Sequence, residues 1–213
     1  MEDKKIRCGI IDSGKGGKYI GSLLQEQFDV EVFQWTPIFF SSYSDMCADD
    51  LVHQCDSHIK YLKEEKVDVV IIGCMTLSTN LVNYITRHFN IPVLDLYTNL
   101  PKLSSNTLVI ATTNTINSNK FKHCVGMPTP DLSRSIEKDC CSIVTGLLRG
   151  YEMMDRRADH CSEILLGCSH YSIVKEELIE YYKGRTVIDP IDYLIKDFKK
   201  IYEATTNSIV SNV

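Results

Sequence analysis

The chain has 213 residues, of which 44% are hydrophobic and 24% charged, proportions that are ordinary for a globular protein. A formal net charge of −5 and the lack of a dense Lys/Arg stripe argue against a nucleic-acid-binding surface. The hydrophobic runs are too short to span a bilayer, and the charged start, Met1-Glu2-Asp3-Lys4-Lys5, leads into a predicted strand and not into a signal-peptide core. We therefore expect no nucleic-acid or membrane partner.

The first half of the chain alternates short apolar runs with amphipathic segments. Buried strands are predicted at 6–11, 30–35, 67–73 and 91–97, and helices at 18–27, 49–66 and 78–89. A glycine-rich loop at 12–17 follows the first strand, and a loop rich in aromatic residues and serines covers 37–45.

The second half repeats this alternation. Strands are predicted at 107–111, 163–167 and 186–188. A polar loop at 112–119 is followed by a predicted helix, and further helices are predicted at 132–149, 151–160, 173–182 and 192–204. The polar tail, 205–213, is expected to be loosely ordered. Strand–helix alternation of this kind predicts an α/β fold with parallel sheets.

Nine cysteines are present, an odd number, and no pair is spaced as Cys-x-x-Cys. This pattern disfavours a secreted disulfide framework and favours reduced thiols, so we expect a cytoplasmic protein. Cys8 lies in a predicted strand, and Cys140 and Cys141 lie in a predicted helix. These three are interpreted as small buried hydrophobic residues.

Two segments, 69–76 (VVIIGCMT) and 163–170 (EILLGCSH), have the same design. Each is an apolar run that ends in Gly-Cys, followed by one residue and then a side chain that can hydrogen-bond. Ligands of open α/β sheets bind at the carboxyl ends of strands. The repeat therefore predicts that Cys74 and Cys168 lie at equivalent points of two similar half-structures.

Two thiols placed in this way could act on opposite faces of one carbon atom. His170, two residues after Cys168, can activate that thiol. Asp12, at the end of the first strand, can serve Cys74 if the first strand neighbours the third. The alternatives are two buried core cysteines, or a zinc site of Cys74, Cys168 and His170 that lacks the usual paired ligand spacing.

The loop Asp12-Ser13-Gly14-Lys15-Gly16-Gly17 stands between a strand and a helix, where backbone N–H groups attract anions. Its spacing fits neither a P-loop nor a dinucleotide fingerprint. A site for a carboxylate-sized anion and a plain tight turn both remain open.

Four segments resemble the signatures of the glutamate racemases, within the aspartate–glutamate racemase family. Residues 11–17 (IDSGKGG) resemble the family's N-terminal motif, and 73–76 (GCMT) its Cys-Asn-Thr motif. Residues 111–118 (ATTNTINS) are similar to its central threonine loop, and 166–171 (LGCSHY) to its Gly-Cys-Thr-His-Tyr motif. The four motifs occur in the family's order, and the resemblance covers roughly residues 6–193.

The resemblance implies two pseudo-symmetric parallel-sheet α/β domains with the active site in the cleft between them. The implied division is 1–97, 98–188, and a C-terminal helix and tail, 189–213, that return to the first domain. It also implies a racemase of an acidic amino acid, glutamate first and aspartate next, that uses no cofactor and no metal. A homodimer is left open.

Carried over residue by residue, the resemblance makes Cys74 and Cys168 the acid–base pair, with Asp12 and His170 as their helpers. Glu137 is the nearest match to the glutamate that the family has near its second cysteine. The expected substrate-binding residues are Ser13, Tyr43, Ser44, Met75, Thr76, Thr112, Thr115 and Ser169.

Two departures from the family pattern bear on function. Met75 replaces an asparagine, which exchanges an amide for a thioether that hydrogen-bonds only weakly. Ser42-Tyr43-Ser44 stands where the family has Pro-Tyr-Gly. These changes keep two alternatives open: a catalytically impaired homologue that binds an acidic amino acid or a protein partner, and a related acid–base or hydrolytic enzyme that acts on another carboxylate.

Overall fold

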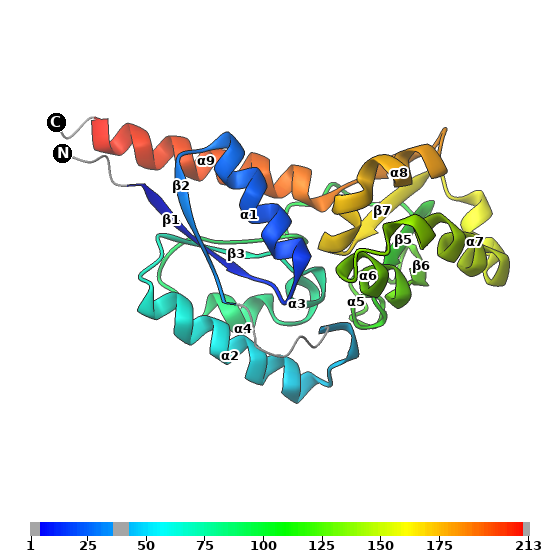
Figure 1. Ribbon diagram of the computed structural model, residues 1–213, viewed down its shortest axis with the longest axis horizontal. Coiled ribbons are helices and arrows are strands. Elements are labelled where there is room, and N and C mark those ends of the chain that lie inside the picture. The colour runs from blue at the N-terminus through cyan, green and yellow to red at the C-terminus, as the bar shows by residue number, and fades with distance from the viewer. Residues whose placement is uncertain (1–4, 36–42, 211–213) are drawn as a thin grey trace.

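A computed structural model of the chain describes residues 5–35 and 43–210, without the side chains of residues 44 and 208–210. Within these residues the chain forms two four-stranded parallel sheets with helices on both faces (Figure 1). The predicted α/β class with two similar halves is confirmed. The predicted loop residues 37–42, Ser42 among them, and residues 211–213 of the tail lie outside the described residues.

The first sheet has the strand order β2-β1-β3-β4. Register pairs Ile11 of β1 with Ile72 of β3, so these two strands end at the same level. The elements of this half are β1 Ile6–Ile11, α1 Lys15–Gln27, β2 Val30–Gln34, the 3-10 turn η1 Tyr43–Asp45, α2 Ala48–Glu64, β3 Val69–Ile72, α3 Met75–Asn80, α4 Val82–Thr86 and β4 Val93–Asp95.

The second sheet repeats this order as β6-β5-β7-β8. Register pairs Ala111 of β5 with Gly167 of β7, the equivalent of the β1–β3 pairing. The elements are β5 Thr107–Ala111, α5 Thr113–Asn117, β6 Val125–Pro128, α6 Pro130–Glu137, η2 Cys141–Ile143, α7 Val144–Met154, η3 Arg156–His160, β7 Glu163–Gly167, η4 Ser169–Val174, α8 Lys175–Tyr181, β8 Thr186–Ile188 and α9 Pro190–Val210.

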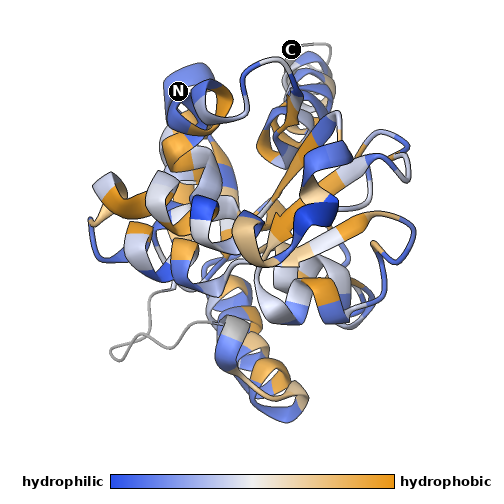
Figure 2. Ribbon diagram, turned by 90° about the vertical axis from the view of Figure 1, so that its right-hand side faces the viewer, coloured by the Kyte–Doolittle hydropathy of each residue, from blue (hydrophilic) through white to orange (hydrophobic). Residues whose placement is uncertain are grey.

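Three apolar clusters hold these layers together. One lies between α2 and one face of the first sheet, and another between α6, α7, α8 and one face of the second. The largest joins the remaining faces of both sheets and includes Phe198 of α9. Figure 1 shows α9 running from the second half back past α1, and Phe198 of α9 packs against Phe28 at the end of α1. Figure 2 shows hydrophobic segments along the strands and alternating hydrophobic and hydrophilic segments along the helices.

Several element predictions were wrong in ways that have physical causes. The helix predicted after residue 119 is absent, and β6 occupies that region. This short edge strand lies beside β5 and contains a glycine and a proline. Its sequence therefore shows no alternation of hydrophobic and polar residues from which a strand could be predicted. The polar loop at 112–119 contains the short helix α5. Residues 205–210, predicted to be loosely ordered, continue α9.

Two predicted helices are interrupted. The predicted helix 78–89 is divided into α3 and α4 at Leu81, whose backbone is not helical. The predicted helix 132–149 is divided into α6 and α7, and Asp139 between them has φ of 60°, the left-handed conformation that ends helices. Hydrophobic periodicity continues through such breaks, which is why it does not locate them.

Candidate active site

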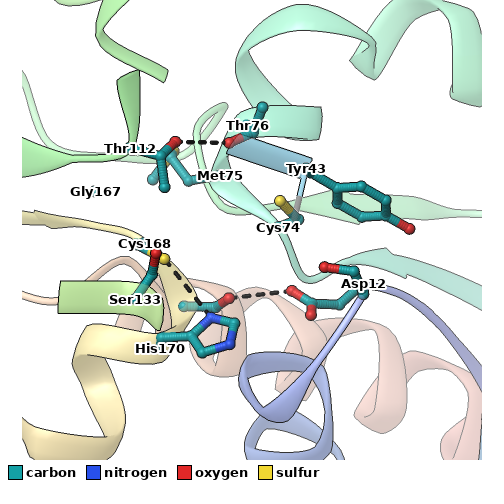
Figure 3. Close-up of a pocket in the computed structure, with 12 residues that line it drawn as sticks. Asp12, Tyr43, Cys74, Met75, Thr76, Thr112, Ser133, Gly167, Cys168 and His170 are labelled. Atoms are coloured by element: carbon teal, nitrogen blue, oxygen red, sulfur yellow. Dashed lines mark hydrogen bonds between the residues drawn. The ribbon is translucent and has the colours of Figure 1, made fainter. Parts of the chain in front are cut away.

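The two repeated Gly-Cys segments end at one cavity. Cys74 follows β3 and is the N-cap of α3, and Cys168 follows β7 and is the N-cap of η4. Both thiols line a narrow cavity of about 20 Å³ between the two halves (Figure 3). All nine cysteines are free thiols. The structure thus brings together the two residues that the sequence placed at equivalent strand ends.

Cys168 begins a chain of polar contacts that continues into α6. Its Sγ lies 3.7 Å from Nδ1 of His170, whose Nε2 lies 2.6 Å from Oε2 of Glu137. Glu137 also accepts a hydrogen bond of 2.9 Å from the backbone N–H of Lys15. Burial opposes charge on His170, yet the contacts with Cys168 and Glu137 outweigh it and raise the pKa of His170 to about 10. Burial likewise opposes ionisation of Glu137, but its bonds to His170 and Lys15 lower its pKa.

Cys74 lies in a different electrostatic environment. Burial, followed by the nearby Asp12 carboxylate, raises the pKa of the Cys74 thiol well above its ordinary value. Asp12 is itself buried, and burial raises its pKa despite hydrogen bonds from the backbone of Gly14 at 2.8 Å and from Oγ of Ser169 at 3.1 Å. The predicted condition for this pairing is met, because β1 and β3 are neighbours.

Three threonine hydroxyls form a triangle at the junction of the halves. Oγ1 atoms of Thr76, Thr112 and Thr115 lie 3.0 Å from one another, and all three residues are buried. Thr76 belongs to α3, while Thr112 and Thr115 belong to the N-cap and body of α5. Thr76 and Thr112 line the cavity. Hydroxyls converging from both halves in a buried site are suited to bind a carboxylate.

The remaining predicted residues are placed as follows. Ser13 and Ser169 are buried and line the cavity, and Ser169 donates to Asp12 across the halves. Tyr43 is buried and also lines the cavity, whereas the side chain of Ser44 is outside the described residues. Met75 is 1% exposed and contributes both to the cavity wall and to the large apolar cluster.

The glycine-rich loop has a steric function that the sequence did not reveal. A Cβ atom on Gly16 would collide with the side chain of Ser169, and one on Gly17 would lie 2.6 Å from Cβ of Asp12. Gly16 therefore permits close approach of α1 to η4, which belong to different halves, and Gly17 lets α1 begin directly against Asp12. This contact supports the interpretation of the loop as a tight turn at the boundary between the halves.

Ser133 and Gly167 also line the cavity, although the sequence did not single them out for the site. Ser133 lies on α6 and donates to the carbonyl of Pro130, and no sequence signal marks it. Gly167 is required by the sheet itself, because a Cβ there would lie 2.6 Å from Cβ of Ala111 and 2.9 Å from the carbonyl of Ile110. Gly167 directly precedes Cys168 in the Gly-Cys motif, and this position is the sequence feature from which its place in the cavity wall could have been predicted.

Two absences hold for the described part of the chain alone. There, no group of three or more His, Cys, Asp or Glu side chains is arranged to hold a metal ion. None of the helices it contains has both the length and the apolar character needed to cross a bilayer.

Comparison with known proteins gives sequence and structural relatives. No protein-family model matches the chain. A glutamate racemase of Fusobacterium nucleatum is 26% identical over 212 residues, covering 89% of this chain and 78% of the relative. The crystal structure of glutamate racemase from Francisella tularensis in complex with D-glutamate matches with a TM-score of 0.80 and 25% identity, covering 95% of this chain and 82% of that one. Allantoin racemase from Klebsiella pneumoniae shares the fold with a TM-score of 0.63 and 15% identity. In sequence and in fold, the chain is similar to the glutamate racemases.

Proposed function

We propose that this protein is an amino-acid racemase that interconverts L- and D-glutamate, or less readily the enantiomers of aspartate, without a cofactor. The observation that carries the proposal is the pair of thiols, Cys74 and Cys168, which reach one cavity from equivalent strands of two similar halves. Racemisation needs a base on one face of the α-carbon and an acid on the other, and the two thiols supply these groups.

The charges around the thiols favour one starting protonation state. We assign Cys168, which lies 3.7 Å from the His170 ring, the role of the thiolate base at the start of turnover, whereas burial and the Asp12 carboxylate raise the pKa of Cys74 and keep it a thiol. For the enantiomer whose α-hydrogen faces Cys168, that thiolate removes the proton and Cys74 donates its own to the opposite face. The product has inverted configuration, and Cys74 is left as thiolate and Cys168 as thiol. The reverse reaction restores the first state.

The difficult step is formation of the carbanion, because the α-hydrogen of an amino acid is a very weak acid. The site stabilises developing charge by fixed hydrogen-bond donors in a buried environment. We propose that the hydroxyls of Thr76, Thr112 and Thr115 bind a substrate carboxylate, and that Ser13 and Ser169 contribute to binding of the remaining polar groups. A cavity between two halves also permits closure that excludes water.

A second candidate function is supported by Met75. This side chain lines the cavity where the family pattern has an amide, so one hydrogen-bonding group of the substrate site is missing. A catalytically impaired homologue that binds an acidic amino acid, or a protein partner, would keep the cavity and lose turnover. Retention of both thiols favours the enzyme over this alternative.

Single alanine substitutions at the two thiols test the proposal. Cys74→Ala and Cys168→Ala should each abolish racemisation of D- and L-glutamate followed by circular dichroism, because each direction needs both a base and an acid. The remaining thiol could still support exchange of the α-hydrogen with solvent deuterium from one enantiomer. Cys140→Ala serves as the control and should leave the rate unchanged, because Cys140 is exposed and lies between α6 and η2, contrary to the expectation of a buried helical residue. Full activity in either of the first two variants contradicts the two-thiol mechanism.

A further inference from the structure

Tyr43 forms part of the cavity wall and is held from both halves of the molecule. Tyr43 lines the cavity beside Cys74 and is 3% exposed (Figure 3). It begins η1, the turn that precedes α2 in the first half. The contacts that hold η1 in place therefore also hold one side of the proposed active site in place.

The second half holds the turn chiefly through the side chain of Asn114. Nδ2 of Asn114 donates hydrogen bonds of 3.0 Å to the carbonyl of Tyr43 and 2.9 Å to the carbonyl of Met46. Asn114 lies on α5, the helix that carries Thr115 and has Thr112 as its N-cap. Arg134 of α6 adds an exposed ion pair of 2.6 Å with Asp45 of the same turn, which contributes little on its own. One short helix thus presents the cavity hydroxyl of Thr112 at its N-cap and also holds η1.

The first half holds the same tyrosine by its other end. The Tyr43 hydroxyl is hydrogen-bonded to Nε2 of His58, a fully buried residue of α2. Burial lowers the pKa of His58 to about 4, so the imidazole is neutral at pH 7. Its Nδ1 has no hydrogen-bond partner within the described residues. The Trp35 ring lies edge-on to the His58 ring with centroids 5.0 Å apart.

We propose that Asn114 and His58 are positioning residues that hold Tyr43 from opposite halves, so that the cavity wall and the threonine hydroxyls come into place together. The inference rests on the proposed function, since it assigns these residues a task in forming that substrate site. We call Asn114, Tyr43 and His58 the Tyr43 clamp. Release of the Asn114 bonds frees the turn from α5 and opens the wall beside Cys74.

Asn114→Ala tests the clamp, and Asn117→Ala is its matched control. Asn117 is exposed on the same helix, and its side chain makes no hydrogen bond within the described residues. Loss of two neutral hydrogen bonds should raise KM for glutamate about tenfold, with a smaller change in kcat, because the substrate must bind to a site whose wall is no longer held. Asn117→Ala should retain the KM of the unmodified protein.

Trp35 gives a second readout that does not depend on catalysis. It is the only tryptophan of the chain, and it contacts His58. In ligand-free protein, Asn114→Ala should increase quenching of Trp35 fluorescence by acrylamide, and Asn117→Ala should not. Tyr43→Phe keeps the ring and the carbonyl that Asn114 binds but removes the bond to His58, so it should alter Trp35 emission with a smaller effect on KM.

The two readouts separate the clamp from the proposed function. If the unmodified protein turns over no acidic amino acid, the racemase proposal fails, and Trp35 quenching still decides whether the clamp exists. An Asn114→Ala protein with unaltered quenching and unaltered KM overturns the clamp. The same conclusion follows if its only defect is a lower thermal unfolding temperature, because that result indicates a purely structural contact.

Discussion

Cys74 and Cys168 occupy equivalent positions in the two halves, but opposite charges face them. A carboxylate lies near the first thiol, and an imidazolium backed by Glu137 lies beside the second. The backbone symmetry therefore brings the two reactive atoms together, while the neighbouring side chains make them chemically unequal. Inequality of this kind suits a reaction that needs one thiol and one thiolate at the start of each turnover.

Met75 offers a test of the enzyme against the binding protein. Its thioether stands in the cavity wall where an amide of the family pattern would bond to a charged group of the substrate. Loss of such a bond costs about 1.5–3 kcal/mol, or roughly ten- to a hundredfold in rate. We expect weak glutamate racemase activity in the natural protein and a higher kcat/KM in Met75→Asn, measured with both enantiomers.

Two other outcomes would each identify a different role for Met75. If Met75→Asn does not raise glutamate turnover while the natural protein racemises another substrate well, Met75 is a specificity adaptation and glutamate is the wrong ligand. If neither protein turns over any acidic amino acid but one such acid binds in calorimetry, the binding-protein alternative replaces the racemase. Met75→Leu is the matched control, since it keeps the volume and adds no hydrogen-bonding group.

The site residues differ in how far the sequence could predict them. Cys74 and Cys168 follow buried strands, so a pattern of a few adjacent residues marks them. Asn114 and Ser133 gain their positions only from the packing of α5 and α6 against other elements, and nothing local marks an asparagine that will meet two distant carbonyls. The contact of Glu137 with His170 likewise depends on where α6 is packed.

At the scale of elements, the boundary between the halves is made where α1, α6 and η4 meet. Glu137 of α6 accepts a hydrogen bond from the backbone N–H of Lys15 in α1 and faces His170 in η4.

Elements with strong local signals were predicted well: the predicted strands 6–11, 107–111, 163–167 and 186–188 match the observed bounds. The edge strand β6 and the one-turn helix α5 depend on their tertiary neighbours and were missed.

The junction of η4 and α6 should make stability depend on pH. The pKa of His170 is about 10 in the folded protein and about 6.5 in an unfolded chain, so between these values the folded state retains a proton that the unfolded state releases. The stabilisation is complete below pH 6.5 and is lost as pH rises towards 10, with a slope of at most about 1.4 kcal/mol per pH unit. Urea unfolding between pH 7.0 and 7.5 measures this slope, above most of the titration of His58 in the unfolded chain and below that of free thiols near pH 8.5.

Glu137→Gln should flatten that dependence, because it removes a carboxylate that favours the charged imidazole. Glu137 is ionised in both states throughout this pH range and contributes no slope of its own. Glu177→Gln, an exposed change on α8, should retain the full slope. An unchanged slope in Glu137→Gln would show that His170 is not held in its charged form by this contact.

At the scale of the whole molecule, the two halves are joined by one continuous apolar cluster. It includes Val69 from the first sheet, Leu165 from the second, and Leu194 and Phe198 from α9. The chain therefore returns to its first half after completing the second sheet (Figure 1). The division into 1–97, 98–188 and 189–213 remains a prediction about independent units, and the shared cluster predicts that the first and third of these depend on one another.

Phe198→Ala measures how much α9 contributes. Phe198 is fully buried, and its ring packs edge-on to Phe28 at the end of α1 with centroids 5.1 Å apart. Removal of a buried phenylalanine ring costs about 3–5 kcal/mol, so the urea midpoint should fall markedly. Lys199→Ala, on an exposed face of the same helix, should change the urea midpoint little.

Because the cluster includes residues of both sheets, far-UV circular dichroism and loss of racemase activity should shift to the same new midpoint in Phe198→Ala. Two separate transitions, of which only one moves, would contradict the shared core and support independent domains.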